Sequence, residues 1–308
     1  MRIREIASGL QFPEGPVAMD DGSVLLVEIA RGTLSRVTPD GKVSVVAELG
    51  GGPNGAAIGP DGQVWICNNG GFHWFRDAGG IRPGPQPADY SGGRIERVNL
   101  ATGKAERVYD ASEGHALRGP NDLVFDTQGG FWFTDLGKGR ERELDRGAIH
   151  YATADGRSIR TVAHPVMTPN GCALSPDGKT LYYAETEGAR AWAFDITGPG
   201  EVRKEAWPSP HGGRMVAAAP GGHYQRFDSM KVDSLGNLCI ATLLHSGISV
   251  ISPDGRMCTH VPMPDPMTTN LCFGGRDLRT MYVTLSYTGK LLAIDDWPIP
   301  GLKLAYNA

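Results

Sequence analysis

Short apolar runs alternate with turn residues along the chain, and one such pattern recurs six times. Each copy begins with Glu, Asn or Asp, continues through an apolar run to a short polar turn, and enters a second apolar run. The copies read EGPVAMDDGSVLLVE, NGAAIGPDGQVWICN, NDLVFDTQGGFWFTD, NGCALSPDGKTLYYAE, DSMKVDSLGNLCIAT and NLCFGGRDLRTMYVT. Two apolar runs joined in this way are typical of a β-hairpin. The pattern therefore predicts six hairpins.

A second pair of strand-like segments follows most copies, as GTLSRVTPDGKVSVVAEL follows the first. Four antiparallel strands in a repeat of roughly 40 to 70 residues are typical of the blades of a β-propeller. A solenoid would have near-constant repeats with distinct caps, whereas these copies vary mainly in loop length. We predict an all-β, six-bladed β-propeller with four antiparallel strands per blade, as a single domain over residues 1–308.

The last blade must be completed at the ends of the chain. RIREIAS at the N-terminus could add the final strand, or LLAIDDWPIPGLKLAY at the C-terminus could close the blade alone. The pattern leaves both alternatives open.

Two long irregular segments, residues 70–93 and 207–227, interrupt the repeats. Insertions of this size are commonly lids or binding loops. The first contains FHWFR, and we predict that His73 and Trp74 contact a substrate. The alternative is that this aromatic cluster only holds the loop against the next blade.

The overall charge excludes several classes of partner. With a formal net charge of −4 and no run of Lys or Arg, the chain has no basic surface signal for nucleic acid. It contains no apolar run of membrane-spanning length, and its N-terminus does not resemble a signal peptide. We expect a cytoplasmic protein without membrane contact, either a monomer or a small homo-oligomer, that acts on a small molecule.

The first residues of the six copies should meet, because the innermost strands of a propeller line its central channel. We call these the lead residues. They are Glu14, Asn54, Asn121, Asn170, Asp228 and Asn270. An Asn or Asp before a strand can also form an Asx turn with its own backbone, and for Asn54 and Asn270 both interpretations stay open. Glu is a poor turn former, so Glu14 favours a functional ring.

Polar residues also close the second strand of the hairpins and should lie beside the leads. These closing residues include Glu28, Asn68, Asp135 and Glu185. Up to five carboxylates are then expected together, with no Lys or Arg at a lead or closing position. Buried acids must take up protons, stay hydrated or bind a cation. Oxygen ligands suit calcium, magnesium or manganese, with zinc or iron also open, so we predict one divalent ion in the channel.

Several short motifs occur in a fixed order: PEGP at residues 13–16, PND at 120–122 with FTD at 133–135, PNG at 169–171, and FDSMKVD at 227–233. Together they resemble the regucalcin and gluconolactonase (senescence marker protein) family of six-bladed lactonases, with diisopropyl-fluorophosphatase as a more distant relative. The resemblance covers nearly the whole chain. It implies a metal site, with calcium the first candidate, bound by Glu14, Asn170 and Asp228.

Asn121 matches a family position that binds either the metal or the substrate. Sugar-lactone members carry an arginine two residues before this Asn, but this chain has Gly119 there and Arg118 one residue further back. This departure weakens the case for an aldonolactone substrate. We predict that Asn121, Arg118 and Glu28 contact the substrate, and that Asn121 also belongs to the metal set.

The reaction implied by the resemblance is hydrolysis of a small lactone. The metal would act as a Lewis acid, and Asp228 would be the base that activates water. Alternatives are a phosphotriesterase-like or aryl-ester hydrolase on the same metal site, or a calcium-binding propeller without catalysis. A strictosidine-synthase-like propeller lacks this metal set, so Glu14 with Asp228 disfavours it. No GxSxG or HExxH motif supports another hydrolytic mechanism.

Overall fold

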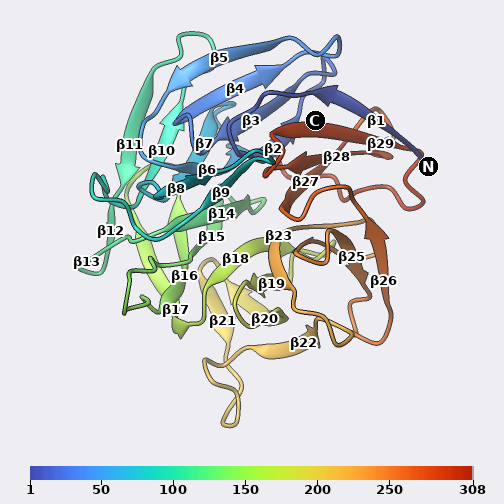
Figure 1. Cartoon of the computed structure of the whole chain (residues 1–308). Helices are drawn as coiled ribbons and strands as arrows, with labels where there is room; N and C mark the ends of the chain where they lie inside the picture. The colour runs from blue at the N-terminus through green and yellow to red at the C-terminus, as the bar shows by residue number, and fades with distance from the viewer. Residues whose placement is uncertain (307–308) are drawn as a thin grey trace.

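Each of the six repeats forms the inner hairpin of one antiparallel sheet. In the computed structural model, which describes residues 1–306, the six sheets stand around a common channel (Figure 1). All regular elements in this part of the chain are β-strands, and none is a helix that could cross a membrane. The prediction of a six-bladed β-propeller with four antiparallel strands per blade is confirmed.

The first three blades follow one another along the chain from the inner to the outer strand. The first blade is β2 (Pro13–Ala18), β3 (Val24–Glu28), β4 (Thr33–Val37) and β5 (Val43–Glu48). The second is β6 (Pro53–Ile58), β7 (Val64–Asn68), β10 (Arg94–Val98) and β11 (Ala105–Tyr109). The third is β14 (Pro120–Phe125), β15 (Gly130–Asp135), β16 (Gly147–Thr153) and β17 (Ile159–Val166), and it is preceded by the short pair β12 (Ala111–Ser112) and β13 (His115–Ala116).

The last three blades show two variations. The fourth is β18 (Pro169–Leu174), β19 (Thr180–Glu185) and β20 (Arg190–Gly198), with its outer edge shared by β21 (Glu201–Arg203) and β22 (Arg214–Ala218). The fifth is β23 (Arg226–Val232), β24 (Leu238–Leu243), β25 (Gly247–Ile251) and β26 (Cys258–Pro262). The sixth is β27 (Thr268–Gly274), β28 (Thr280–Leu285) and β29 (Lys290–Asp295), completed by β1 (Arg2–Ala7).

Strands from both ends of the chain close the ring. The N-terminal β1 pairs antiparallel with β29, with Arg2 opposite Asp295, and lies beside it in Figure 1. Arg4 reinforces the pair through an Nε contact of 2.8 Å with the Asp295 carboxylate. Of the two alternatives left open by the sequence, the N-terminal segment is therefore the one that closes the last blade.

The hydrophobic core is divided among the six interfaces between neighbouring blades. Between the second and third blades, for example, Trp65 packs against Phe131 with ring centroids 5.2 Å apart. Between the third and fourth, Trp132 and Tyr183 belong to one buried cluster. Each blade is thus stabilised by burial against its two neighbours, so the ring must close before all of its apolar surface is buried.

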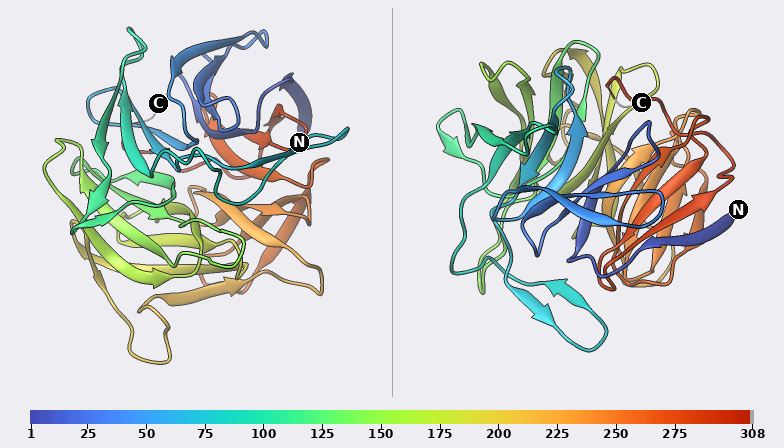
Figure 2. Two further views of the ribbon diagram at one scale, coloured as in Figure 1. Left: turned by 60° about the vertical axis from the view of Figure 1, so that its left-hand side comes forward. Right: turned by 90° about the horizontal axis from the view of Figure 1, so that it is seen from above.

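The two insertions differ in form. Residues 70–93 contain the hairpin of β8 (Trp74–Arg76) and β9 (Ile81–Pro83), which stands out from one face of the ring in Figure 2. Part of the second insertion, residues 207–227, is β22, which pairs with the first half of β20. That part is therefore a blade strand and not an irregular loop, because the long β20 leaves an edge that β21 covers only at its far end.

Every inner strand has a pairing irregularity at or beside its lead residue. Such bulges bend a strand and redirect its side chains, often next to functional sites. Glycine then allows the inner strands to approach: a Cβ on Gly15, whose φ is +53°, would lie 2.7 Å from the carbonyl oxygen of Asn54. A Cβ on Gly55 would lie 2.4 Å from that of Asn121. The small residue after these leads therefore permits the tight ring.

Candidate active site in the central channel

The lead residues of different blades lie together at one end of the channel. All six are buried: Glu14, Asn54, Asn121, Asn170, Asp228 and Asn270. Hydrogen bonds join them across blades, because Asn270 Nδ2 donates to Glu14 Oε2 at 2.7 Å. Asn54 Nδ2 likewise donates to the main-chain oxygen of Asn121 at 3.2 Å. The structure thus brings the predicted ring together.

The two acids of the ring share a dry environment. Burial raises the pKa of Glu14 to about 7, although hydrogen bonds from Asn270 and Gly15 offset part of the rise. Burial also raises the pKa of Asp228 well above its usual value, and the nearby charge of Glu14 raises it further. Two negative charges are therefore costly at this place unless a cation compensates them.

The amide side chains of the ring provide further oxygen donors. The Oδ1 atom of Asn121 is buried and has no hydrogen-bond partner within residues 1–306. The Nδ2 atom of Asn170 donates to Thr186 Oγ1 at 3.0 Å. This bond orients the amide so that Oδ1 of Asn170 faces Ser229, the neighbour of Asp228. Buried polar atoms normally have a partner, so the orphaned oxygen beside two acids fits a hard cation.

The donor set that fits a cation is a mixed one. Across residues 1–306, no three His, Cys, Asp or Glu side chains are grouped as a metal site. A site in this channel would therefore combine the carboxylates of Glu14 and Asp228 with the amide oxygens of Asn121 and Asn170. Calcium, magnesium and manganese accept such all-oxygen sets.

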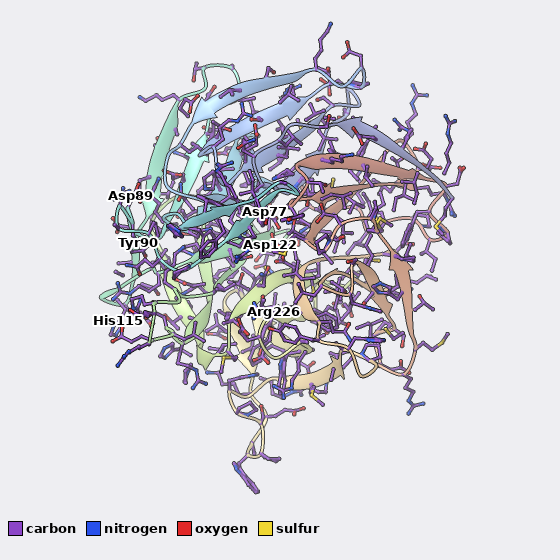
Figure 3. The ribbon with its side chains drawn as sticks, viewed as in Figure 1. Asp77, Asp89, Tyr90, His115, Asp122 and Arg226 are labelled. Atoms are coloured by element: carbon purple, nitrogen blue, oxygen red, sulfur yellow. The ribbon has the colours of Figure 1, made fainter. Side chains whose placement is uncertain are left out.

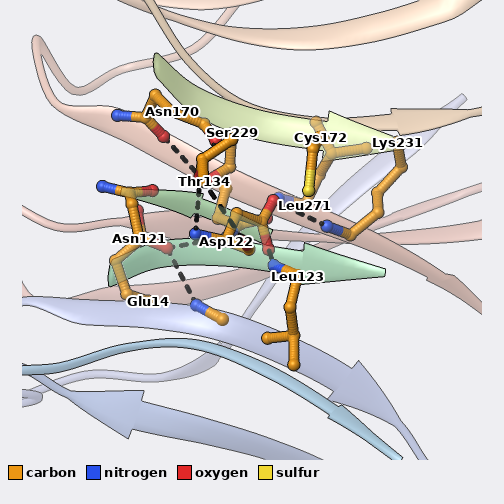
Figure 4. A network of polar contacts seen from close by, with 12 residues as sticks. Glu14, Asn121, Asp122, Leu123, Thr134, Asn170, Cys172, Ser229, Lys231 and Leu271 are labelled. Atoms are coloured by element: carbon orange, nitrogen blue, oxygen red, sulfur yellow. Dashed lines mark hydrogen bonds and ion pairs between the residues drawn. The ribbon is translucent and has the colours of Figure 1, made fainter. Parts of the chain in front are cut away.

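An ion pair, which the sequence patterns did not reveal, lies in the channel beside the ring (Figure 4). The Nζ atom of Lys231 is 3.3 Å from Oδ2 of the buried Asp122. Burial lowers the pKa of Lys231, but the Asp122 carboxylate outweighs this effect and the pKa is raised overall. Asp122 follows Asn121 at the bulge of β14, where the alternation of inward and outward residues fails. The channel therefore contains a buried cation, although no lead or closing residue is Lys or Arg.

The closing residues do not join the ring. In five of the six blades the closing residue pairs with the residue before the lead, as Glu28 does with Pro13. Because consecutive strand residues point to opposite faces, lead and closing side chains diverge. Asn68, Asp135 and Glu185 have the same pairing. The predicted gathering of up to five carboxylates is not found.

Glu28 has a role inside its own blade. It is fully buried, and its oxygens accept hydrogen bonds from Ser35 Oγ at 2.7 Å and from the backbone N–H of Gln11 at 2.8 Å. Arg31 lies 3.1 Å from the same carboxylate. This placement corrects the prediction that Glu28 contacts substrate, since both oxygens already bind groups of the first blade.

Arg118 lies outside the ring as well. Its exposed side chain lines a cavity on the third blade together with His115 and Asp135, and no lead residue lines that cavity. A Cβ on Gly119 would lie 2.4 Å from the carbonyl oxygen of Gly137. The chain therefore has no room for a side chain at the position where the resemblance implied an arginine in sugar-lactone members, and Arg118 lines a cavity that no lead residue lines.

His73 and Trp74 are held by the insertion itself. Trp74 packs on Phe12 at 5.1 Å between ring centroids, and His73 meets Phe75 edge-on at 5.0 Å. The hairpin also bonds to Tyr287 of the last blade through its backbone and a side chain. The aromatic cluster thus holds the insertion against the first and last blades, and not against the next blade as the alternative stated, and a substrate contact by either residue stays a prediction.

Lys138, which no sequence motif marked, fastens the start of the same insertion. Its buried Nζ donates to Asn69 Oδ1 at 3.0 Å and to the carbonyl oxygen of Gly71 at 2.7 Å, and it lies 3.9 Å from the centre of the Phe72 ring. Asn69 in turn donates to the lead residue Asn54 at 3.1 Å. Burial lowers the pKa of Lys138 to about 7. The insertion is therefore connected to the ring by a chain of hydrogen bonds.

The sequence of this ring and its blades matches a known family model. The model, described as the SMP-30/Gluconolactonase/LRE-like region, matches residues 12–287, which include all six lead residues. The chain belongs to the SMP-30/gluconolactonase/LRE-like family. The resemblance inferred from the short motifs is thereby confirmed.

Individual proteins are also similar to this chain in sequence or in structure. A gluconolactonase of Zymomonas mobilis is 27% identical over 318 residues, covering 92% of this chain and 79% of that protein. Diisopropyl-fluorophosphatase of Loligo vulgaris is 32% identical over 188 residues, covering 56% of each chain. A solved structure of a protein assigned to the gluconolactonases has a TM-score of 0.74 at 25% identity, covering 98% of this chain and 94% of that one. The matches support a hydrolase of the lactonase type.

Proposed function

We propose that this member of the SMP-30/gluconolactonase/LRE-like family is a divalent-metal-dependent lactonase whose active site is the ring of lead residues. The observation that carries the proposal is the pair of buried acids, Glu14 and Asp228, next to the unpartnered amide oxygen of Asn121. A scaffold that only bound other proteins would gain nothing from these costly groups inside its channel.

Glu14, Asn121, Asn170 and Asp228 would hold the ion, for which calcium is our first choice because hard oxygen donors alone form the set. When bound, a divalent ion would polarise the lactone carbonyl and stabilise the negative charge that develops on its oxygen. The chain keeps these ligands in place through the bonds from Asn270 to Glu14 and from Asn170 to Thr186.

Asp228 is the proposed base. Its carboxylate accepts a proton from the attacking water, whose oxygen bonds to the carbonyl carbon. The ring C–O bond then breaks, and the proton passes to the departing alkoxide oxygen, so the product is an open-chain hydroxy acid. Asp228 has the largest relative exposure of the six buried lead residues, 8%.

A hydrolase acting on phosphotriesters or aryl esters is a second candidate on the same ring. It is favoured by the 32% identity to diisopropyl-fluorophosphatase and by the lack of space for a sugar-binding arginine at Gly119. Both candidates share the proposed metal ligands and differ in the residues that surround the substrate.

The test is hydrolysis of a panel of small lactones, aryl esters and phosphotriesters by metal-stripped protein to which single divalent ions are returned. Glu14→Gln and Asp228→Asn keep the side-chain shapes and remove the charges, and Asn237→Ala, at the opposite end of the fifth blade, is the control. We expect metal-restored lactone hydrolysis that the first two variants lose and the control keeps. Metal binding without hydrolysis of any substrate in the panel would instead support a calcium-binding propeller.

A further inference from the structure

A cavity of about 780 Å³ lies on the third blade, next to the channel but separate from it. Its walls come from the loop before β14, the loop before β16, the strands β16 and β17, and Lys204 of the fourth blade. None of the six lead residues lines it. In Figure 3, His115 at its outer end lies near the edge of the molecule, whereas Asp122 of the channel lies near the centre. The cavity is thus a second site.

Three basic side chains line this cavity. They are the side chains of Arg118, Arg146 and Lys204, and within residues 1–306 none of the three forms an ion pair with an acid. They come from three different segments of the chain, so only the folded structure places them together. The protein as a whole has a net charge of −4, so the concentration of positive charge here is local and does not reflect a basic protein.

Three acids also line the cavity: one is paired with a cation outside the lining, one is held by backbone N–H groups, and one has no bonded partner among the described residues. Asp135 accepts backbone hydrogen bonds from Arg118 at 2.7 Å and from Gly119 at 2.7 Å, and Asp145 pairs with Arg140 at 2.5 Å. The acid without a bonded partner is Glu113. Like charges that share a cavity repel one another, and a bound anion would relieve this repulsion.

The inner wall offers neutral polar groups beside the cations. His150 is buried, and burial lowers its pKa, which keeps the ring neutral at pH 7. Its Nδ1 lies 3.3 Å from the hydroxyl of Thr161, which also lines the cavity. Neutral donors and acceptors next to guanidinium groups suit an organic acid with both carboxylate and hydroxyl or carbonyl groups better than a bare inorganic ion.

We propose that this cavity binds a small organic polyanion with two or three negative charges, through Arg118, Arg146 and Lys204. Arginine binds carboxylate and phosphate groups with paired hydrogen bonds, and three cations from separate segments can engage separate groups of one molecule. The site does not depend on the metal ring, because it shares no residue with it. Its volume accommodates an organic acid of small size.

The test is calorimetric titration of the full-length protein at low salt with tricarballylate, a tricarboxylate, and with inorganic sulfate and acetate for comparison. The double variant Arg146→Ala/Lys204→Ala removes two of the cations. The matched control Arg157→Ala/Lys179→Ala removes two exposed cations from turns at the other end of the blades. We expect millimolar or tighter binding of tricarballylate that weakens about tenfold per removed cation, as expected for charge-assisted bonds, and that also weakens with added salt.

The Glu14→Gln variant separates this site from the ring. Because the proposed anion site shares no residue with the channel, Glu14→Gln should leave tricarballylate binding unchanged even if it abolishes hydrolysis. The proposal is overturned if tricarballylate does not bind, if both double variants weaken binding equally, or if Glu14→Gln abolishes binding while the Arg146→Ala/Lys204→Ala protein retains it. Stronger binding of sulfate than of tricarballylate would overturn the assignment to an organic polyanion.

Discussion

Asn270 in the last blade donates a hydrogen bond of 2.7 Å to the carboxylate of Glu14 in the first blade. The two residues are 256 positions apart in the sequence and meet only when the ring closes. The bond therefore couples closure of the fold to the position of a proposed metal ligand. It lies in the interior, where a charged acceptor that loses its donor is costly.

Asn270→Ala should lower both stability and activity. We expect a loss of about 1 to 3 kcal/mol in the free energy of unfolding, because Glu14 keeps its burial but loses a donor. The activity, kcat/KM, should fall by about 10- to 100-fold, the range typical for residues that position metal ligands. Urea denaturation and lactone hydrolysis measure the two effects. Asn237→Ala, which removes a bond of 2.8 Å to Asp233 at the far end of the fifth blade, should affect stability alone.

The metal-free protein should become less stable as the pH rises. The pKa of Glu14 is about 7 in the folded chain, against 4.5 for a free glutamate side chain, which stands for the unfolded state. The folded state therefore holds the proton more tightly. This contribution to stability is fully present below pH 4.5 and is lost as the pH rises through 7. Urea denaturation in the presence of a chelator, repeated at several pH values from 4.5 to 7, measures this change in the free energy of unfolding.

Glu14→Gln is the control for this pH effect, because glutamine does not titrate. Its stability should change less over the same range, and adding the metal to the unmodified protein should also reduce the slope. An equal slope in both proteins would show that other groups, and not Glu14, cause the dependence.

Lys231→Met should destabilise the protein strongly, because Asp122 would keep a buried charge without its partner at 3.3 Å. Breaking a buried ion pair from one side typically costs about 3 to 5 kcal/mol. The double change Asp122→Asn/Lys231→Met removes both charges and should recover much of this loss. Denaturant unfolding of the two single variants and the double variant gives the coupling energy, and a double variant as unstable as the sum of the singles would contradict the pairing.

Glu28→Ala should reveal a structural residue. Its carboxylate binds Ser35 and the backbone of Gln11, so we expect a loss of about 1 to 3 kcal/mol in stability. The kcat/KM of the folded protein should stay close to that of the unmodified protein, because the side chain points away from the ring. A large fall in kcat/KM with unchanged stability would restore Glu28 as a substrate contact.

Lys138→Met should loosen the insertion at residues 70–93. Methionine has a similar length but cannot donate to Asn69 or to the carbonyl oxygen of Gly71. Limited proteolysis should cut the insertion faster, and kcat/KM should fall because Asn69 no longer holds Asn54 in the same way. Lys179→Met, at an exposed turn, is the matched control and should change neither.

The sequence alone determined the architecture and the ring of leads. Six hairpins with a polar residue at each start specify inner strands that line a channel, because local periodicity and turn chemistry are written in neighbouring residues. The same repeat pointed to all six lead residues, and the family resemblance carried by the order of the short motifs singled out Glu14, Asn121, Asn170 and Asp228 among them. Each of these signals lies within one repeat or in the spacing of repeats.

Only the tertiary structure decided what depends on register and on contacts between distant segments. Glu28 faces away from the ring because it pairs with Pro13, the residue before the lead, and the bulge after Pro120 brings Asp122 into the channel. Lys231 and Lys138 find their partners across 109 and 69 positions. A shift of one residue reverses the direction of a strand side chain, so the sequence could place these residues on a strand but could not say which way they face.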